Sequence, residues 1–424
     1  MNESGTRKRR PRLRERTVYA VWELTLRCNL LCIHCGSRAG KARERELDTS
    51  EALDLVRQLG EVGVDEITLI GGEAYLRRDW FEIAQAIAAR GMVCTMTTGG
   101  YGLSPALARR IYDAGIHTVS VSIDGMEESH DRQRGRAGSW RACLRALELL
   151  HEAGVQTGCN TQVNRLSAPD LPALADLLCA TDIVGWQVQF TNPMGNAVDN
   201  SWLILQPAEL LDVYPVIAGL AKRIRKAGIR MAAGSNLYYY GPFAKTILQE
   251  RLGRSGRYEG CLAGIQVIGI EADGKIKGDP SLPTSRYVGG NIREQTLPEI
   301  LMTDELTFNL ADDPGLWGFC GTCKHASACR GGCAWTADVF FGRRGNNPYC
   351  HHRALTLARR GLRERVVKVR EASPDPFAHG EFAIVEEPLD APWPDGDSHH
   401  LTRERMRSPL TAADARGAAA RATG

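Results

Sequence analysis

The chain has 424 residues, a length that accommodates about two to three domains. Its hydrophobic share of 43 % is ordinary for a packed core, and its net charge of +3 is too small to argue for nucleic-acid binding. The basic start shows no signal peptide, and no run approaches the ~18 apolar residues of a membrane helix. We therefore expect a cytoplasmic protein with no membrane and no nucleic-acid partner. Its thirteen cysteines then indicate metal binding rather than disulfides.

The N-terminal segment is strongly basic. Seven Lys or Arg residues stand against one Glu between residues 6 and 16. This composition predicts a disordered, solvated tail over residues 1–16. A docking arm for an acidic partner peptide is the alternative.

Residues 17–235 alternate between apolar runs of strand length and amphipathic helical stretches. The predicted strands are 18–26, 66–70, 92–97, 118–123, 155–163 and 186–190. The predicted helices are 50–60, 80–90, 105–114, 140–153 and 171–179. This alternation predicts an α/β fold of parallel βαβ units with right-handed crossovers. Six strands rather than eight predict a partial (β/α)6, TIM-like barrel, with function at the C-terminal ends of the strands.

Three cysteines follow the first predicted strand, Cys28, Cys32 and Cys35, at spacings of four and three residues. Thiolates are the preferred ligands of iron–sulfur clusters. A cubane cluster has four irons, so three cysteines leave one iron with an open coordination position for chemistry. The alternative is a structural zinc site, which would want a fourth ligand that is not obvious nearby.

This C-x3-C-x2-C loop after a first strand resembles the radical S-adenosylmethionine (radical SAM) family. The resemblance implies that the open iron of a [4Fe–4S] cluster is chelated by S-adenosylmethionine, which is cleaved to a 5′-deoxyadenosyl radical. It also implies that the ring of His34 packs near the adenine of that cofactor.

Three further segments at strand ends fit the resemblance. Gly71, Gly72 and Glu73 follow the second predicted strand and resemble the Gly-Gly-Glu motif of the family, which binds the amino group of S-adenosylmethionine. Residues 97–100 after the third strand resemble its Thr-Asn-Gly segment, with Thr98 in the middle position. By resemblance, Ser122 and Asp124 at the end of the fourth strand lie near the sugar and methionyl groups, although Asp124-Gly125 alone could be a turn.

Four amides lie on predicted strands five and six, and they are candidates for lining a substrate cavity. They could equally satisfy one another. The four residues are Asn160, Gln162, Gln187 and Gln189.

A second set of cysteines lies in the C-terminal third of the chain. Cys261 precedes a predicted hairpin with an Asp273-Gly274 turn. A dense, glycine-rich run of five cysteines follows, which indicates metal binding, and a zinc ribbon is the alternative to iron–sulfur clusters. These five are Cys320, Cys323, Cys329, Cys333 and Cys350.

The spacing of this second set resembles the SPASM extension of radical SAM enzymes, which carries two auxiliary iron–sulfur clusters. The resemblance assigns Cys320, Cys323, Cys329 and Cys350 to an outer cluster, and Cys261 and Cys333 to an inner one. Asp279 stands where the family usually has cysteine. Either its carboxylate ligates the inner cluster, or that cluster is incomplete or absent and Asp279 lies in a turn.

We expect the remaining segments to connect or to trail these units. Residues 236–256 are predicted to form a bridge, and 257–371 the SPASM unit, closed by a basic helix over 353–371. Residues 372–424, rich in Pro, Asp, Ser, His and Ala, are predicted to be a disordered tail.

The resemblance implies an oxidoreductase that modifies a ribosomally made precursor peptide, by crosslinking or oxidation. It also implies an electron donor such as a flavodoxin or ferredoxin. A radical SAM dehydrogenase or oxidase of a small molecule is the first alternative. A non-catalytic iron–sulfur or zinc module is the second.

Overall fold

The main structural element is a ten-stranded sheet with the strand order β10-β9-β8-β1-β2-β3-β4-β5-β6-β7. The computed structural model describes residues 18–234, 236, 237, 240–248, 258, 260–394, 397, 400, 401 and 406. The predictions for the basic tail and for part of the bridge lie outside the described residues. The strands of the sheet are β1 (Val18–Thr25), β2 (Val64–Gly71), β3 (Val93–Thr98), β4 (Ile116–Ser122), β5 (Gln156–Val163), β6 (Gly185–Phe190), β7 (Arg230–Ala233), β8 (Val267–Ile270), β9 (Lys275–Lys277) and β10 (Val288–Asn291).

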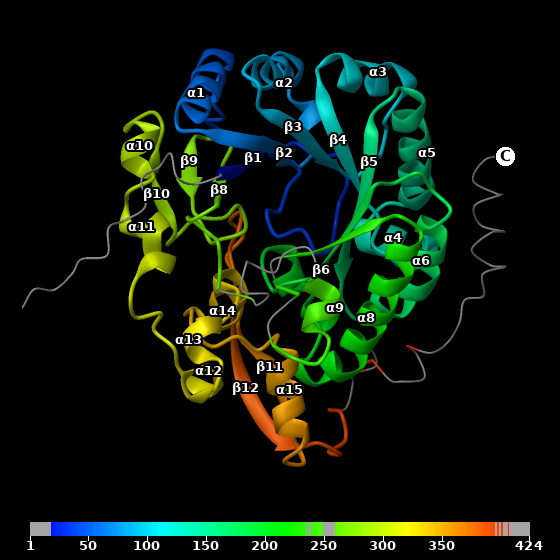
Figure 1. The fold of residues 1–424 in the computed structure, drawn as a ribbon, viewed down its shortest axis with the longest axis vertical. Coiled ribbons are helices and arrows are strands. Elements are labelled where there is room, and N and C mark those ends of the chain that lie inside the picture. The colour runs from blue at the N-terminus through cyan, green and yellow to red at the C-terminus, as the bar shows by residue number, and fades with distance from the viewer. Residues whose placement is uncertain are drawn as a thin grey trace, which may run out of the picture.

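Strands β1 to β7 are parallel and adjacent in chain order. The six predicted strands are confirmed within a few residues, and β7 adds a seventh. The sheet curves but leaves β7 and β10 at its two edges, so the fold is a partial TIM-like barrel (Figure 1).

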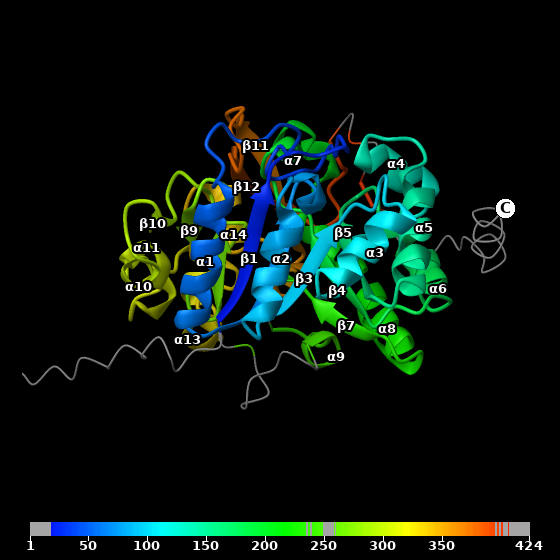
Figure 2. The same cartoon turned by 90° about the horizontal axis from the view of Figure 1, so that it is seen from above.

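Helices follow one another around the outer side of the curved sheet (Figures 1 and 2). The helices of the barrel are α1 (Thr49–Glu61), α2 (Trp80–Ala89), α3 (Pro105–Asp113), α4 (Glu127–Arg134), α5 (Ser139–Glu152), α6 (Leu171–Leu178), α7 (Asn196–Asp199), α8 (Leu210–Lys226) and α9 (Ala244–Leu248). Two helix starts follow the expected capping chemistry. Asp48 forms a capping box with Glu51 before α1, and the Ser104 side chain accepts from Leu107 N before α3.

One helical stretch in the described part of the chain, Ser201–Lys226, is long and apolar enough to cross a bilayer by composition. Its apolar window is 61 % buried inside the protein. The stretch includes α8, whose apolar face packs into the core with residues such as Leu210, Val213 and Ile217.

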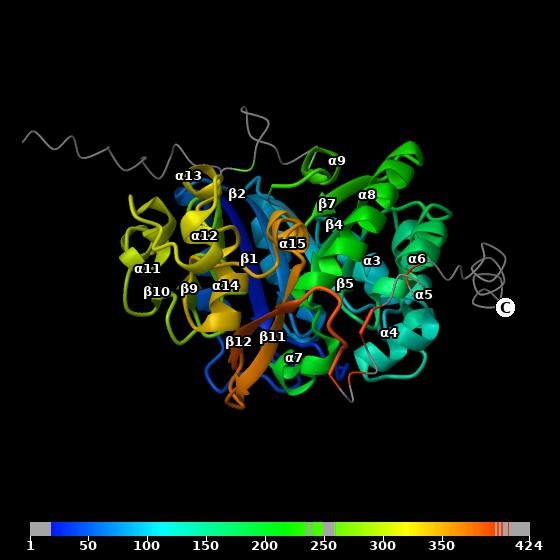
Figure 3. The same ribbon diagram turned by 90° about the horizontal axis from the view of Figure 1, so that it is seen from below.

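The C-terminal unit continues the same sheet. Strand β8 pairs in parallel with β1, and the predicted hairpin is confirmed as β8–β9 with Gly274 at φ +89° in its turn. The unit lies beside and below β8 and β9 in Figure 1, and Figure 3, the view from below, shows it next to β1. Its helices are α10 (Leu297–Ile300), α11 (Asp304–Thr307), α12 (Gly318–Thr322), α13 (Ala326–Cys329), α14 (Ala334–Phe341) and α15 (His351–Ala358).

The prediction of a helix over residues 353–371 is wrong for its second half. Helix α15 ends at Ala358, and strand β11 runs over Leu362–Arg370. Gly361, at φ +71°, separates the two elements. The β-branched residues Val366, Val367 and Val369 favour the strand that follows.

The prediction of a disordered tail is also wrong for its first part. Strand β12 (Glu381–Pro388) pairs antiparallel with β11. The charged composition that suggested disorder instead forms cross-strand pairs, such as Arg363 Nη2 with Glu387 Oε1 at 2.7 Å. Composition alone cannot distinguish such pairs from a solvated tail.

Phe382 is expected to anchor β12. It is 5 % exposed, and its ring centroid lies 5.4 Å from that of Phe340 on α14. Phe382→Ala should destabilise the protein by about 3 kcal/mol through lost burial and the cavity left behind. Urea unfolding measures the change, with Val369→Ala, 60 % exposed on β11, as the control. Equal small effects of both variants would show that β12 is not anchored through this ring.

Candidate cluster and cofactor site

The three cysteines after β1 lie in one loop whose ends are tied together. Gly40 N donates to Leu26 O at 2.8 Å, and Cys28 N donates to Gly40 O at 3.3 Å. Burial raises the pKa of Cys32 to about 12, and the nearby thiols of Cys35 and Cys28 add to that rise. The structure therefore brings the three predicted ligands together in one loop.

Two of these sulfur atoms accept backbone hydrogen bonds, as cluster ligands commonly do. Leu30 N lies 3.4 Å from Cys28 Sγ, and Ala39 N lies 3.4 Å from Cys35 Sγ. The barrel cysteine Cys143 differs, because its thiol donates to Gly99 O at 3.1 Å. The donor set at the loop thus suits thiolates, whereas Cys143 is satisfied as a protonated thiol.

The segment after β6 holds the cysteine loop by its carbonyl groups. Asn196 donates from its backbone N to Cys35 O and from Nδ2 to Cys32 O, both at 2.9 Å. Asn200 Nδ2 donates to Ile33 O at 3.1 Å. Gly195, at φ +58°, lies so close that an added Cβ would stand 2.4 Å from Cys35 O. These residues were not predicted from the sequence, where their position just after a strand end was the only signal for them.

The Gly-Gly-Glu segment packs directly against the same loop. Gly72 N donates to Thr25 O, and Glu73 N donates to Arg27 O, each at 2.8 Å. An added Cβ on Gly72 would stand 2.1 Å from Arg27 O and 2.8 Å from Cys28 Cβ. Only glycine permits this close approach.

Glu73 is a buried carboxyl group beside the loop. Its Oε2 accepts from Thr98 Oγ1 at 2.5 Å, and its Oε1 accepts from Gly99 N at 2.6 Å. Burial raises the pKa of Glu73 to about 7, although these hydrogen bonds oppose the rise. The residues of the predicted Thr-Asn-Gly-like segment therefore orient the carboxyl group of the Gly-Gly-Glu motif.

Asp124 is fully buried at the end of β4 and bound by protein groups. Its Oδ2 lies 2.6 Å from Arg134 Nη2 and 3.4 Å from His34 Nε2, and its Oδ1 accepts from Gln162 N at 2.8 Å. Burial alone would raise the pKa of Asp124, but Arg134 and His34 hold it below its ordinary value. Arg134 Nη1 lies 3.8 Å from Cys32 Sγ. Asp124 thus holds Arg134 beside the cysteine loop and contacts His34 within it.

Ser122 lies on the inner face of β4, partly exposed, next to Asn160 on β5. Its carbonyl group accepts from the Cys143 thiol at 3.5 Å. The structure thus places Ser122 on the inner side of the sheet, and its role toward a cofactor stays a prediction.

The four cysteines assigned to the outer cluster, Cys320, Cys323, Cys329 and Cys350, also lie close to one another. Burial raises the pKa of the Cys329 thiol, and the nearby thiols of Cys350, Cys320 and Cys323 raise it further. Asn347 N donates to Cys320 Sγ and His325 N donates to Cys323 Sγ, both at 3.4 Å. The four thiols that the family resemblance assigns to one ligand set are therefore neighbours around α12, α13 and the start of α15.

The inner set is a separate group. Burial raises the pKa of Cys333, and Cys261 and then Asp279 raise it further through their proximity. Asp279 Oδ1 also accepts from Ser281 N at 2.9 Å, so this residue forms the predicted turn as well. In the described part of the chain, no three His, Cys, Asp or Glu side chains meet the geometry of a single metal-ion site.

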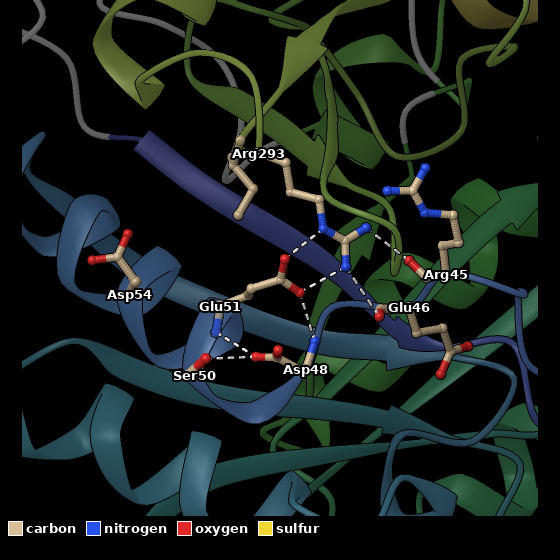
Figure 4. Close-up of a pocket in the computed structure, with 8 residues that line it drawn as sticks. Arg45, Glu46, Asp48, Ser50, Glu51, Asp54 and Arg293 are labelled. Carbon is tan, nitrogen blue, oxygen red and sulfur yellow. Dashed lines mark hydrogen bonds and ion pairs between the residues drawn. The ribbon is translucent and has the colours of Figure 1, made fainter.

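A surface pocket of about 750 Å³ lies apart from these cysteines, at the start of α1 (Figure 4). Arg293 crosses it and binds Glu51 through Nε and Nη2, at 2.5 and 2.6 Å. Its Nη1 also donates to Arg45 O at 3.0 Å. These bonds join the C-terminal unit to α1, so the pocket marks a structural contact.

A partial parallel barrel with three cysteines after its first strand and a buried Gly-Gly-Glu carboxyl group beside them defines an S-adenosylmethionine radical enzyme. Residues 22–165 match the family model of the Radical SAM superfamily. A mycofactocin maturase, MftC of Mycobacterium ulcerans, is 30 % identical over 343 residues, covering 78 % of this chain and 87 % of the relative. The chain belongs to the radical SAM superfamily.

The chain is also similar to proteins other than mycofactocin maturases. An AdoMet-dependent heme synthase of Methanosarcina barkeri is 29 % identical over 342 residues, covering 78 % of this chain and 96 % of the relative. Streptococcus suis SuiB bound to its precursor peptide SuiA has a TM-score of 0.61 at 17 % identity, covering 79 % of this chain and 76 % of SuiB. The similarity to SuiB supports the assignment of the fold.

Glu73→Gln is expected to change stability and cofactor binding in opposite directions. The neutral carboxyl group contributes stability that is full below pH 4.5 and is lost as the pH rises through about 7. At pH 8 the apoprotein variant should therefore melt at a higher temperature than wild type, and this difference should vanish near pH 4. Affinity for S-adenosylmethionine should fall, because the carboxylate that would meet its amino group is gone.

Thermal melts across pH and calorimetric titration with S-adenosylmethionine measure both effects. Glu82→Gln, exposed on α2, is the matched control and should change neither. A variant that binds the cofactor as tightly as wild type would contradict the role of Glu73.

Proposed function

We propose that this chain is a radical SAM/SPASM enzyme, an oxidoreductase that modifies a precursor peptide. Cys28, Cys32 and Cys35 would hold the reactive [4Fe–4S] cluster, and Glu73 would bind the amino group of S-adenosylmethionine. The observation that carries the proposal is the packing of the cysteine loop against the buried Glu73 carboxyl group, through Gly71 and Gly72. A cluster and cofactor held by these residues would supply 5′-deoxyadenosyl radical chemistry, the removal of a hydrogen atom from a substrate.

The chain's own residues contribute binding, orientation and shielding. Asn196 and Asn200 fix the carbonyl groups of the cysteine loop. Thr98 and Gly99 orient Glu73, and Asp124 holds His34 and Arg134 at the loop. Glu73, Thr98 and Asp124 are buried, and they would help to exclude water from a site where the radical would otherwise be quenched.

The C-terminal unit would hold auxiliary clusters. Cys320, Cys323, Cys329 and Cys350 would ligate the outer cluster, and Cys261 and Cys333 the inner one, with Asp279 as the third protein group there. Such clusters would pass electrons between the barrel and a donor such as a flavodoxin or ferredoxin. This assignment divides the chain into a barrel over residues 17–235 and a SPASM unit that begins at 257 and, because β12 pairs with β11, extends beyond 371 to Pro388, in a cytoplasmic enzyme.

A ribosomally made precursor peptide is the substrate class that we favour. It is supported by the similarity to mycofactocin maturase and by the shared fold with SuiB. A small-molecule substrate is the second candidate. The similarity to heme synthase over 96 % of that relative favours a tetrapyrrole within that class.

Anaerobic reconstitution with iron and sulfide, followed by dithionite and S-adenosylmethionine, tests the proposal. We expect 5′-deoxyadenosine, detected by liquid chromatography, and a mass change in a peptide encoded beside the gene. If 5′-deoxyadenosine is absent from the fully loaded protein, the chain is a non-catalytic iron–sulfur or zinc module.

A further inference from the structure

Four side-chain amides form a compact group on two adjacent strands inside the barrel. Asn160 and Gln162 lie on β5, and Gln187 and Gln189 lie on β6. The parallel pairing sets Asn160 beside Gln187 and Gln162 beside Gln189. We call these four residues the amide patch.

The amide patch faces the inside of the curved sheet. Successive residues of a strand point to opposite faces. The residues between the amides belong to the hydrophobic core under the outer helices, for instance Cys159, Trp186 and Val188, each 1 % exposed. All four amide residues are partly exposed. They therefore line the inner, accessible side of the sheet.

The amides do not satisfy one another. No hydrogen bond joins any of their four side chains to another residue within the part of the chain that the structure describes, although their backbone groups are bonded, as in Gln162 N to Asp124 Oδ1. Each primary amide carries two donor hydrogens and one acceptor oxygen. The patch thus offers eight donors and four acceptor oxygens to a ligand or to water.

One end of the amide patch is connected to the cysteine loop through Asp124 and Arg134. Asn160 pairs with Ser122 at the end of β4. Gln162 donates its backbone N–H to Asp124, whose other oxygen binds the Arg134 that approaches Cys32. A ligand on the patch would therefore lie next to the proposed radical site.

The chemistry of this face is polar and uncharged. The inner-facing residues of β4 to β6 are Thr118, Ser120, Ser122, Gln156, Gly158, Asn160, Gln162, Gly185, Gln187 and Gln189. A tetrapyrrole carries a wide apolar ring and carboxylates, which call for an apolar wall and cations. An extended peptide main chain offers alternating N–H and C=O groups. A primary amide can accept a hydrogen bond from the N–H groups through its oxygen and donate to the C=O groups through its nitrogen.

We propose that the amide patch binds the main chain of an extended peptide substrate, with little dependence on the peptide's sequence. The inference rests on the proposed function only for the reaction that follows binding. The neighbouring hydroxyl groups of Ser120 and Ser122 would extend the polar wall toward β4.

Binding of defined peptides to the reconstituted holoenzyme with S-adenosylmethionine tests this proposal. A library of acetylated, amidated ten-residue peptides is incubated with the enzyme, and retained members are identified by mass spectrometry. The tightest peptide is labelled with fluorescein for anisotropy titration. Each of its main-chain N–H groups is then methylated in turn.

We expect methylation at two or more positions to weaken binding to the wild-type enzyme about tenfold, the value of one neutral hydrogen bond. Gln187→Met and Gln162→Met, which keep side-chain length but remove the amide, should each weaken binding by about the same factor. Gln85→Met, exposed on α2, should not change it.

The wild-type experiment does not depend on whether the variants fold. The proposal is overturned if no library peptide is retained, or if main-chain methylation has no effect at any position. It is also overturned if iron coproporphyrin III, titrated by its absorbance, loses affinity in the Met variants while the peptide does not. Formation of 5′-deoxyadenosine by the same preparation separates failure of this proposal from failure of the radical SAM function.

Discussion

Cys32→Ala is expected to abolish 5′-deoxyadenosine formation while leaving the iron of the C-terminal unit in place. Cys32 lies between the other two thiols in sequence, and Arg134 Nη1 approaches its sulfur at 3.8 Å. Two remaining thiols cannot hold a cubane with a single open iron, so the loop should lose its cluster. The thiols of Cys320 and Cys350 belong to a separate group, so the iron of the C-terminal unit should stay bound.

The measurement combines liquid chromatography of the nucleoside product with iron and sulfide analysis of the purified protein. Cys179→Ala is the matched control, because that thiol is partly exposed at the end of α6 and far along the chain from both groups. Iron should fall by one cluster's content in Cys32→Ala and should not fall in the control. Loss of all iron would mean that the ligands were divided wrongly between the sites.

The barrel was predictable because its determinants are local. Each strand and helix carries its own apolar period, and caps such as Ser104 mark helix starts. The spacing of Cys28, Cys32 and Cys35 was equally readable, because these three residues are close in sequence. Local signals therefore predicted the fold class and the first cysteine loop, whereas the division of the second cysteine set, in which Cys261 lies far before Cys333, rested on the family resemblance.

The two-stranded sheet formed by β11 and β12 was not predictable by the same reasoning. Strand β12 lies in a charged, proline-containing segment, and its partner β11 follows a short helix with only Gly361 as a break. Each strand is stabilised by pairing with the other and by Phe382 packing on Phe340. Such stabilisation comes from contacts between segments that are far apart, which a composition argument cannot contain.

The supporting residues of the site were missed for a related reason. Asn196 and Asn200 bind carbonyl groups that lie more than 160 positions earlier in the chain. Arg134 was visible only as part of a polar segment after the fourth strand. Its contact with Asp124 and Cys32 depends on the turn at Gly135, where an added Cβ would stand 2.3 Å from Leu31 O. Contacts of this kind exist only once the barrel has closed around the loop.

Asp124→Ala is expected to destabilise the apoprotein by about 3–5 kcal/mol, the effect of removing one partner of a buried ion pair. Asp124 is 0 % exposed and Arg134 is 9 % exposed, so the variant leaves a buried guanidinium without its carboxylate. His34 loses its partner as well. Because Arg134 and His34 lower the pKa of Asp124, the wild-type advantage should be full above pH 3.8 and should shrink as the pH falls through the lowered value.

Urea unfolding of the wild type, the single variants and the double variant Asp124→Ala/Arg134→Met measures the coupling. Since the double variant removes the uncompensated charge, it should be more stable than Asp124→Ala alone. Asp54→Ala, which breaks an exposed pair with Arg57, should cost less than about 1 kcal/mol. If Asp124→Ala costs no more than Asp54→Ala, then Asp124 does not hold Arg134 at the cysteine loop, and Asp124 is available to contact the cofactor directly.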